Sequence, residues 1–437
     1  MRKRLAFAVA VGVAGSLALA ACGGGKSGGT AAAPADPATA SGDITVLTNR
    51  TDLVQDGTFR TYVAEFNKTY PKVKVNVQGV TDYEGEVKIR MNTSNYGDVL
   101  LIPAALAKDN YPRFFESLGA SDDLSKKYRY TDYSTVDGKV YGIAQNGNAN
   151  GFVYNKAVWQ QAGVTSPPKT PDEFVAALSA IRTKTSAIPY YTNYHDGWPL
   201  TKWQDAVGSA SCDTKAGNDL ATTQSPWSPG HDLYTIDTLL YTIVHDKLTE
   251  PDPATTNWEN SKNLVGTGKI ATMWLGSWAV SQMRDAAKKA GKNPDDIGFM
   301  PFPTQVNGKF CAVSAHDFDQ AVSSHSKNKP AARAWLDWFT DKSGYAQSQG
   351  SIPTLKSGPM PDTLVDYTRL GVQYIELDQN QTALVNKIDN AAEVGLAKPD
   401  YRQHLVDVAR GAASGSIDNV FADLNKKWSA GIKSAGG

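Results

Sequence analysis

Tryptophan and tyrosine side chains stand among loop-forming residues at several places in this chain. Tyr194 and Trp198 lie in "YYTNYHDGWPL", Trp227 lies in "SPWSP", and Trp278 lies in "LGSWAV". A flat ring beside fixed polar groups suits a ligand with an apolar face and an edge of hydroxyls, and sugars have that form. The alternative for each ring is packing in the core. We treat these residues as candidate ligand contacts and assign Trp335 and Trp338, on a regular apolar helix, to packing.

Trp274 and Trp278 flank a Gly276–Ser277 pair in "KIATMWLGSWAVSQM" (269–283). On one continuous helix the two rings would form a single buried stripe. A Gly-Ser interruption is unfavourable inside a helix and is common in a strand-to-helix turn. We therefore predict that Trp274 ends a buried strand, and that Trp278 begins a helix with its ring facing a ligand.

Motifs of catalysis and metal binding are weak in this chain. "GKSGG" and "GGGKSG" (within 23–29) match nucleophile and dinucleotide patterns, but a glycine-rich stretch produces such matches without the required strand and helix. "HDFD" (316–319) lacks an accompanying H-E-x-x-H or paired C-x-x-C motif, so no metal and no cofactor is expected. A glycosidase needs two facing carboxylates, which 44 Asp and Glu residues neither reveal nor exclude.

The N-terminus has the features of a targeting segment. "MRKR" is basic, "LAFAVAVGVAGSLALAA" is a short apolar run, and Cys22 follows directly. "LALAAC" resembles a bacterial lipobox, which implies cleavage of residues 1–21 and lipidation of Cys22. Residues 22–42 are rich in Gly, Ala and Pro and are expected to form a flexible tether. The expected location is the extracellular face of a bacterial membrane.

Charge and cysteine content narrow the possible partners. Without residues 1–21 the chain has 41 Lys and Arg against 44 Asp and Glu, a net charge of −3, which does not favour nucleic acid. Cys212 and Cys311 are then the remaining cysteines, and they form either one disulfide or two buried thiols. The length of 437 residues predicts two lobes or domains.

Strand and helix patterns alternate along the chain, which is typical of α/β folds. Strands are expected at 43–48, 72–78 and 98–103 with helices at 56–71 and 81–92 between them. In "TPDEFVAALSAIR" (170–182), Thr170 is the expected N-cap and Glu173 the partner in a capping box. Further elements are expected in the order strand 187–193, helix 230–247, strands 269–275, 297–303 and 310–324, helix 328–344, and a largely helical tail from Pro361.

The order of these segments resembles one family, the bacterial extracellular solute-binding proteins of ABC importers, in the sugar-binding group that includes maltose-binding protein. The similarity covers "FRTYVAEFNKTYPKVKV", "GDVLLI", "YGIAQN", "GFVYNKAVWQQAGV", "TPDEFVAAL", "GTGKIATMWLGSW", "MPFP" and "NKPAARAWLDWFTDKSGYAQSQGSIPT". The resemblance implies a lipid-anchored monomer that captures a carbohydrate and presents it to permease subunits, without enzymatic activity.

The resemblance also implies a two-lobe α/β fold of the type II periplasmic-binding-protein class, with the ligand in the cleft between lobes. Three hinge crossovers are expected near 144–151, 301–304 and 351–354, and they contain Gly, Pro or small residues. Lobe 1 would comprise 43–148 and 304–352, and lobe 2 would comprise 149–303 and 353–437.

The family's ligand contacts fall, position by position, on loops at strand ends and on the first crossover. These positions hold Asn49, Asp52, Tyr83, Glu84, Asn146, Asn148, Tyr194, Trp198 and Trp278. His316 and Asp317 stand where many relatives have small residues, so they are expected to influence specificity. Pro103, Ala104 and Ala105 stand where some sugar binders have an aromatic and an acid, which disfavours a long maltodextrin.

Two further classes of function remain open from the sequence. The chain could bind another polar solute, such as a polyol, a glycerophosphodiester or a peptide, although no basic cluster marks a phosphate site. It could also be a secreted glycoside hydrolase or a cell-surface adhesin.

Overall fold

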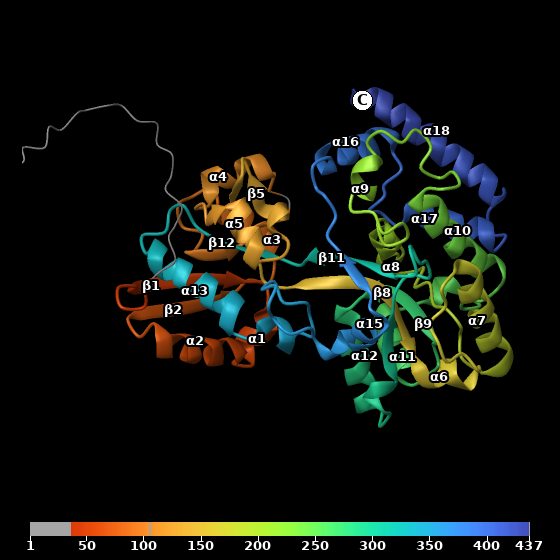
Figure 1. Cartoon of the computed structure of the whole chain (residues 1–437), viewed down its shortest axis with the longest axis horizontal. Coiled ribbons are helices and arrows are strands. Elements are labelled where there is room, and N and C mark those ends of the chain that lie inside the picture. The colour runs from red at the N-terminus through yellow and green to blue at the C-terminus, as the bar shows by residue number, and fades with distance from the viewer. Residues whose placement is uncertain (1–35, 105, 437) are drawn as a thin grey trace, which may run out of the picture. The chain divides into compact units, whose positions relative to one another are not determined.

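Three sheets organise the computed structural model, which describes residues 36–104 and 106–436 (Figure 1). The first sheet has the order β2-β1-β3-β12-β7. β1 is parallel to β2 and to β3, whereas β12 is antiparallel to β3 and β7. Its strands are β1 Gly42–Thr48, β2 Val73–Gly79, β3 Val99–Leu101, β7 Ile143–Ala144 and β12 Asp319–Val322.

The second sheet has the order β10-β8-β11-β13, with β9 paired to β8. β8 is antiparallel to β9, β10 and β11, and β11 is parallel to β13. Its strands are β8 Gly147–Asn155, β9 Thr272–Gly276, β10 Ile297–Met300, β11 Cys311–His316 and β13 Gln373–Ile375. A small third sheet consists of β4 Gly119–Ala120, β5 Thr135–Val136 and β6 Lys139–Val140.

Helices connect and cover the strands. They are α1 Thr51–Gln55, α2 Thr58–Thr69, α3 Tyr83–Arg90, α4 Tyr111–Phe114, α5 Ser121–Lys127, α6 Lys156–Gln161, α7 Pro171–Lys184, α8 Trp198–Thr201, α9 Ala216–Asp219, α10 Asp232–His245, α11 Trp258–Gly266, α12 Trp278–Lys289, α13 Lys329–Lys342, α14 Tyr345–Ser348, α15 Val365–Leu370, α16 Thr382–Ala392, α17 Asp400–Ala409 and α18 Ile417–Ala435. The chain also forms short 3-10 helices, among them η2 Thr131–Ser134 and η3 Lys202–Ala206. In the part of the chain that the structure describes, no helix is long and apolar enough to cross a membrane.

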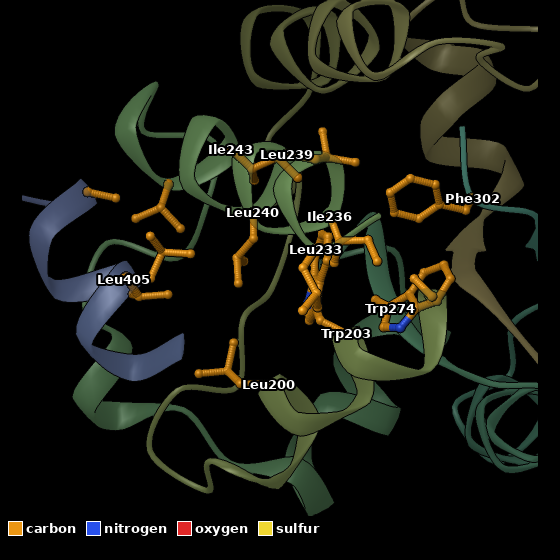
Figure 2. Close-up of a cluster of buried hydrophobic side chains, with 14 of the residues drawn as sticks. Leu200, Trp203, Leu233, Ile236, Leu239, Leu240, Ile243, Trp274, Phe302 and Leu405 are labelled. Carbon is orange, nitrogen blue, oxygen red and sulfur yellow. The ribbon is translucent and has the colours of Figure 1, made fainter. Parts of the chain in front are cut away.

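Periodic apolar residues determine where these helices pack. α2 buries Phe59, Tyr62 and Phe66 on one face, and the Phe59 ring stacks on Phe339 of α13 at 6.0 Å between centroids. In the second sheet's core, Trp203, Trp274 and Phe302 pack with the apolar face of α10 (Figure 2). Burying such a large side chain contributes about 1.5–3 kcal/mol. The first and second sheets therefore have separate apolar cores.

The N-cap of α7 is as predicted, and its capping box is half formed. Thr170 Oγ accepts a hydrogen bond from the backbone N–H of Glu173 at 3.1 Å. The Glu173 carboxylate accepts from the N–H of Lys169 at 2.7 Å, and that residue precedes the cap. In a capping box the glutamate would accept from the N–H of Thr170, so here it binds the N–H one position earlier.

The predicted strand at 187–193 does not form. Ile188 makes an isolated bridge to Ile270, and the rest of the segment is irregular. Pro189 has no N–H to donate, and Asn193 has a φ of 57°, so the segment cannot continue a ladder. Conversely, the tail that was expected to be largely helical also contains β13.

The chain passes between the first and second sheets at three places. The first is residues 145–146, between β7 and β8, within the predicted span. The second is 317–318, between β11 and β12. The third lies between β12 and β13, in the segment that contains Ile352. The predicted crossing at 301–304 is wrong, because β10 and β11 on its two sides belong to the same sheet. Residues 304–316 therefore belong with the second sheet rather than with the first.

The three crossing segments are hydrogen-bonded to one another. The Gln145 N–H donates to Phe318 O at 2.8 Å, and the Asp317 N–H donates to Asn146 O at 3.0 Å. In the third segment, Ile352 exchanges two backbone bonds of 2.8 Å with Gly147. The first crossing thus lies beside each of the others.

The prediction of a flexible tether as far as residue 42 is wrong for its last residues. The N–H groups of Thr39 and Ala40 donate to Asp36 O, and the Ala40 side chain is buried in the core of the first sheet. Ordered structure therefore begins before residue 43. Residues 1–35, which include the predicted signal segment and Cys22, lie outside the described residues.

Candidate functional site

A cavity of about 540 Å³ adjoins the first two crossings. Its wall comes from β8, the end of β11, η2, η3, the first residue of α12 and the segment 377–397. This size is typical of small-molecule sites.

β8 contributes a row of asparagines to this wall. Asn148 and Asn150 line the cavity, because alternate residues of a strand point to the same face. Asn150 Nδ2 donates to Asp205 O at 3.3 Å, and Ser277 Oγ donates to Asn148 Oδ1 at 3.4 Å. Asn146 precedes the row, is buried, and does not line the cavity. Its Oδ1 has no hydrogen-bond partner among the described residues.

The turn between β9 and α12 separates the two tryptophans as predicted. Trp274 is 1% exposed, and its Nε1–H donates to Lys202 O at 2.7 Å. Trp278 is half-buried and lines the cavity. A Cβ on Gly276 would lie 2.3 Å from Nε1 of Trp278, so the close approach of this indole requires glycine.

Trp278 belongs to a cluster of three rings. Its centroid lies 6.0 Å from that of Trp198 and 5.6 Å from that of Trp258. Trp198 does not line the cavity. It supports Trp278 from one side.

His316 and Asp317 both line the cavity, where β11 ends. The His316 ring stacks on Tyr133 at 3.8 Å, and its Nδ1 lies 2.9 Å from Asp319 Oδ1. Ser134 Oγ donates to the other oxygen of Asp319. Burial lowers the pKa of His316, but the charge and hydrogen bond of Asp319 outweigh burial and raise it above 6.5.

η3 places three polar side chains in the wall. Lys202 Nζ lies 3.4 Å from Asp205 Oδ2, and Gln204 stands between them in sequence. Burial raises the pKa of Asp205, and the nearby Lys202 opposes this rise. These side chains give the wall both hydrogen-bond donors and acceptors.

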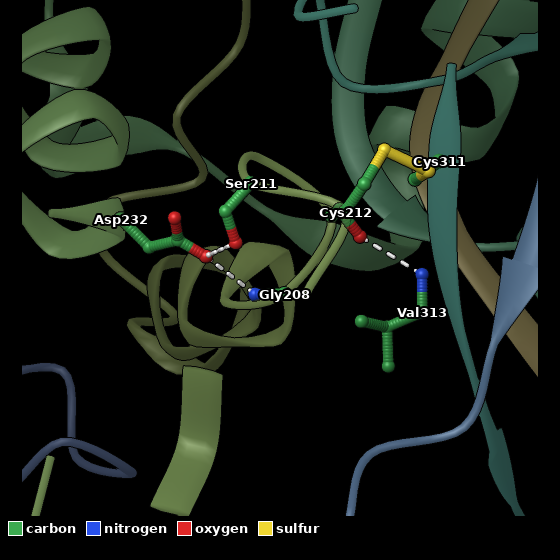
Figure 3. The surroundings of a disulfide bond; sticks show 7 residues. Gly208, Ser211, Cys212, Asp232, Cys311 and Val313 are labelled. Carbon is green, nitrogen blue, oxygen red and sulfur yellow. Dashed lines mark hydrogen bonds between the residues drawn. A yellow bond between two sulfur atoms is a disulfide. The ribbon is translucent and has the colours of Figure 1, made fainter. Parts of the chain in front are cut away.

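Cys212 and Cys311 form a disulfide, one of the two alternatives that the sequence leaves (Figure 3). It fastens the loop after η3 to the start of β11. The Val313 N–H donates to Ser209 Oγ at 2.8 Å beside it. Both connected segments carry cavity-lining residues, Val207 and Val313. The disulfide therefore holds two parts of the wall together.

Four predicted contacts near the first sheet do not line this cavity. Tyr83 is buried, and its hydroxyl accepts from the Leu101 N–H at 2.7 Å and donates to Leu101 O at 3.1 Å. Glu84 accepts from the Ala104 N–H at 3.1 Å. Asp52 pairs with Arg50 at 2.6 Å. Asn49 is half-buried in the loop after β1.

Two loop aromatics also have partners inside the protein. The Tyr194 hydroxyl donates to Asp407 Oδ2 at 3.0 Å, and Tyr194 does not line the cavity. Trp227 is buried, and its Nε1–H donates to Asp237 Oδ2 at 2.7 Å. Trp227 is thus a core residue.

Sequence reasoning missed several wall residues: Tyr133, Asn150, Lys202, Gln204 and Asp205. The period of two in "NGNAN" could have found Asn150. The residues of η3 have no comparable signal, because a short 3-10 helix has no sustained periodicity. Tyr133 is placed by its stacking on His316, a contact between distant segments.

The wall combines two aromatic rings with amide, carboxylate, ammonium and imidazole groups. Such a surface can bind a polar ligand that has an apolar face, through contact with the rings and hydrogen bonds to the amides and acids. Within the described residues, no group of three or more His, Cys, Asp or Glu side chains is placed to hold a metal ion.

Comparisons with known proteins identify the family of this chain. Residues 51–346 match the family described as bacterial extracellular solute-binding protein. The multiple sugar-binding protein of Streptococcus mutans is 24% identical over 65% of this chain and 68% of its own length. The diacetylchitobiose binding protein DasA of Streptomyces coelicolor is 27% identical, with 79% and 80% covered. A putative binding protein of Brucella abortus is covered over 55% of its length.

A solved structure resembles the fold over most of the chain. It is a manno-oligosaccharide specific solute binding protein of Bifidobacterium animalis subsp. lactis in complex with mannotriose. The TM-score is 0.77 and the identity is 32%, over 91% of this chain and 96% of that one. The two-domain α/β fold of solute-binding proteins therefore describes this chain. Together with the match over residues 51–346, this likeness shows that the chain belongs to the bacterial extracellular solute-binding protein family.

Proposed function

We propose that this protein captures a carbohydrate, a mono- or oligosaccharide, in the cavity and delivers it to the membrane permease of an ABC importer. The observation that carries the proposal is the placement of the Trp278 indole beside the amides of Asn148 and Asn150. A sugar ring can pack its apolar face on the indole while its hydroxyls bond to the amides.

Relatives support this proposal by what they bind. The mannotriose complex belongs to the 32% identical protein, and a 34% identical binding protein of an ABC transporter from the same organism is solved with mannobiose. Manno-oligosaccharides are accordingly the first ligands to try.

Not all proposed contacts have the same role. Asn148, Trp278, His316 and Asp317 are proposed to touch the ligand directly, because they line the cavity. Five of the predicted contacts outside its wall are proposed to act only after the two domains close, as hinge closure brings new groups to a ligand. They are Asn49, Glu84, Asn146, Tyr194 and Trp198. Tyr83 and Asp52 already pair with Leu101 and Arg50, and we propose that they support their loops without touching the ligand.

The cellular setting is proposed from the sequence. A lipid on Cys22 would hold the monomer at the outer face of the cell membrane, where the closed form would meet the permease. We propose binding without catalysis, since the named relatives are binding proteins.

Calorimetry against a sugar panel tests this function. The panel contains mannobiose, mannotriose, raffinose, diacetylchitobiose and their monosaccharides, and a polyol and a dipeptide serve as non-sugar probes. We expect saturable binding of at least one sugar, weakened in Trp278→Ala. Binding of the non-sugar probes alone would contradict the proposal, and release of reducing sugar from the panel would indicate a hydrolase instead.

A further inference from the structure

A buried ion pair lies behind the cavity wall. Arg402 of α17 and Asp237 of α10 are both 0% exposed, and Arg402 Nε donates to Asp237 Oδ1 at 3.0 Å. Trp227 Nε1–H donates to the second oxygen of Asp237 at 2.7 Å. The Arg402 guanidinium also lies over the Tyr401 ring, 4.6 Å from its centroid. Neither charged residue lines the cavity.

Such a pair is costly to bury, so its other contacts matter. The desolvation of two charges offsets much of their attraction, and an apolar pair of similar size is often as stable. Arg402 uses two of its remaining donors on two residues of the cavity wall. Nη2 donates to Gln204 Oε1 at 3.2 Å, and Nη1 donates to Leu396 O at 3.4 Å. The ion pair is thus connected directly to the wall.

The contact with Gln204 determines which end of its amide faces the ligand. A guanidinium has only donors, so the amide must turn its oxygen toward Arg402. The two N–H groups of Nε2 then point elsewhere, and Nε2 has no hydrogen-bond partner among the described residues. Because Gln204 lines the cavity, these donors are available to a ligand.

We infer that Arg402 is a positioning residue for ligand binding: it fixes Gln204 so that the wall presents N–H donors to an oxygen of the ligand. The inference rests on the proposed function and adds a requirement to it. The ligand must place against Gln204 an oxygen that can only accept there, such as a ring or glycosidic ether oxygen, or a hydroxyl whose hydrogen is bonded elsewhere. A donor-only group at that point would be rejected, since it would face other donors.

Gln204→Glu is the sharpest single test. The variant keeps an oxygen toward Arg402 and replaces the Nε2 donors by a second oxygen, with little change in volume. With the panel sugar that binds wild type best, we expect at least a tenfold weaker Kd and an unfolding midpoint no lower than that of wild type. An unchanged Kd would overturn the inference.

A double-mutant cycle tests the part assigned to Arg402. Arg402→Lys keeps a positive charge for Asp237 but lacks the fork that also reaches Gln204. We expect it to weaken the Kd about tenfold in wild type and not further in a Gln204→Ala background. Equal losses in both backgrounds would indicate a purely structural role and would overturn the inference. Asp237→Asn is the matched control, because it alters the same ion pair without touching Gln204.

A readout without ligand keeps the inference separate from the proposed function. The side-chain NH2 signals of Gln204 in a ¹H–¹⁵N spectrum can be assigned by their loss in Gln204→Ala. Arg402→Lys should move them toward the positions of a free glutamine, and Asp237→Asn should move them less. If the Gln204 NH2 signals keep their positions in Arg402→Lys, the positioning role is refuted, whether or not a sugar binds. If the signals move but no sugar of the panel binds wild type, only the carbohydrate function is refuted. If Arg402→Lys does not fold, Gln204→Glu decides.

Discussion

Two regions of the molecule are rich in polar and aromatic side chains. One is the part of the cavity wall that β8 and β11 contribute, and the other comprises the loop after β1 and the start of α3. They use these groups differently. Asn150 donates one hydrogen bond through Nδ2, which leaves its Oδ1 available to a ligand. Tyr83 uses its hydroxyl as donor and acceptor to the same backbone residue, Leu101. Spare hydrogen-bonding capacity, rather than residue type, therefore distinguishes a ligand-binding surface from a self-satisfied one.

Trp274→Ala should give the largest effect, and it should fall on stability. The indole is fully buried among Phe152, Trp203 and Phe302, and it donates to the backbone of η3. Removing it leaves a cavity and an unpaired carbonyl, which costs about 3–5 kcal/mol. Urea unfolding measures this loss. Trp274→Phe, which fills most of the space, is the control and should lose less.

Glu250→Gln should change the pH dependence of stability around the loop that carries Trp198. Glu250 is buried and accepts hydrogen bonds from the N–H and the hydroxyl of Thr192. Burial raises its pKa from 4.5 to about 7, although the bonds from Thr192 lower it in part. Because the folded-state pKa is the higher one, this group's contribution is complete below pH 4.5. It falls by about 3 kcal/mol as the pH rises through 7.

The variant mimics the protonated acid and cannot ionise. Its free energy of unfolding should therefore exceed that of wild type at pH 8 and match it near pH 4.5, in urea titrations at both pH values. Glu259→Gln, at an exposed position, is the control, and its difference in stability from wild type should be the same at both pH values. A Glu250→Gln variant that is equally destabilised at both pH values would contradict the assignment.

Trp278→Ala should lower affinity more than stability. The ring is half-buried and supported by Trp198 and Trp258, so its exposed face is free for a ligand. Losing the burial of one aromatic face costs about 2 kcal/mol, or roughly a 30-fold increase in Kd. Calorimetry with the best panel sugar measures it. Similar losses of affinity in the Trp274 and Trp278 variants would refute the division between the two rings.

Tyr83→Phe should affect stability alone. The change removes one oxygen and leaves the N–H and C=O of Leu101 without their partner, at a cost of about 1–3 kcal/mol. Kd for the same sugar should stay within about twofold of wild type. A clear loss of affinity would mean that Tyr83 reaches the ligand and would remove the contrast between the two regions.

Much of the fold could be predicted from local patterns, because local physics specifies it. Thr170 with the following proline marks the start of α7, and the Gly276–Ser277 interruption marks the turn that separates two rings. The second crossing was missed because "FCAVSAHDFDQAVSS" is apolar on both sides of Asp317, so β11 and β12 read as one strand. The place where the chain leaves one sheet and enters the other depends on which distant strands pair with β11 and β12, and the local pattern does not contain that information.

The site could be predicted only where a strand or turn fixes side-chain direction. Asn148, Trp278, His316 and Asp317 stand at such positions, and they line the cavity. Gln204 stands on a short 3-10 helix, and Arg402, which orients it, is 198 residues away in the chain. Tertiary hydrogen bonds of this kind leave no trace in local composition.

Asp52→Ala should give the smallest effect. Its side chain is 61% exposed and pairs with Arg50, and that pairing lowers the pKa of Asp52. An exposed ion pair contributes about 0.2–1 kcal/mol, and salt screens it. Arg50 also donates to Gln349 Oε1 at 2.5 Å, so the loop keeps a second anchor after the substitution. We therefore expect a change below about 1 kcal/mol in urea unfolding and an unchanged Kd at about 0.15 M salt. A tenfold weaker Kd in Asp52→Ala, with stability intact, would show that this loop binds the ligand despite lying outside the cavity wall.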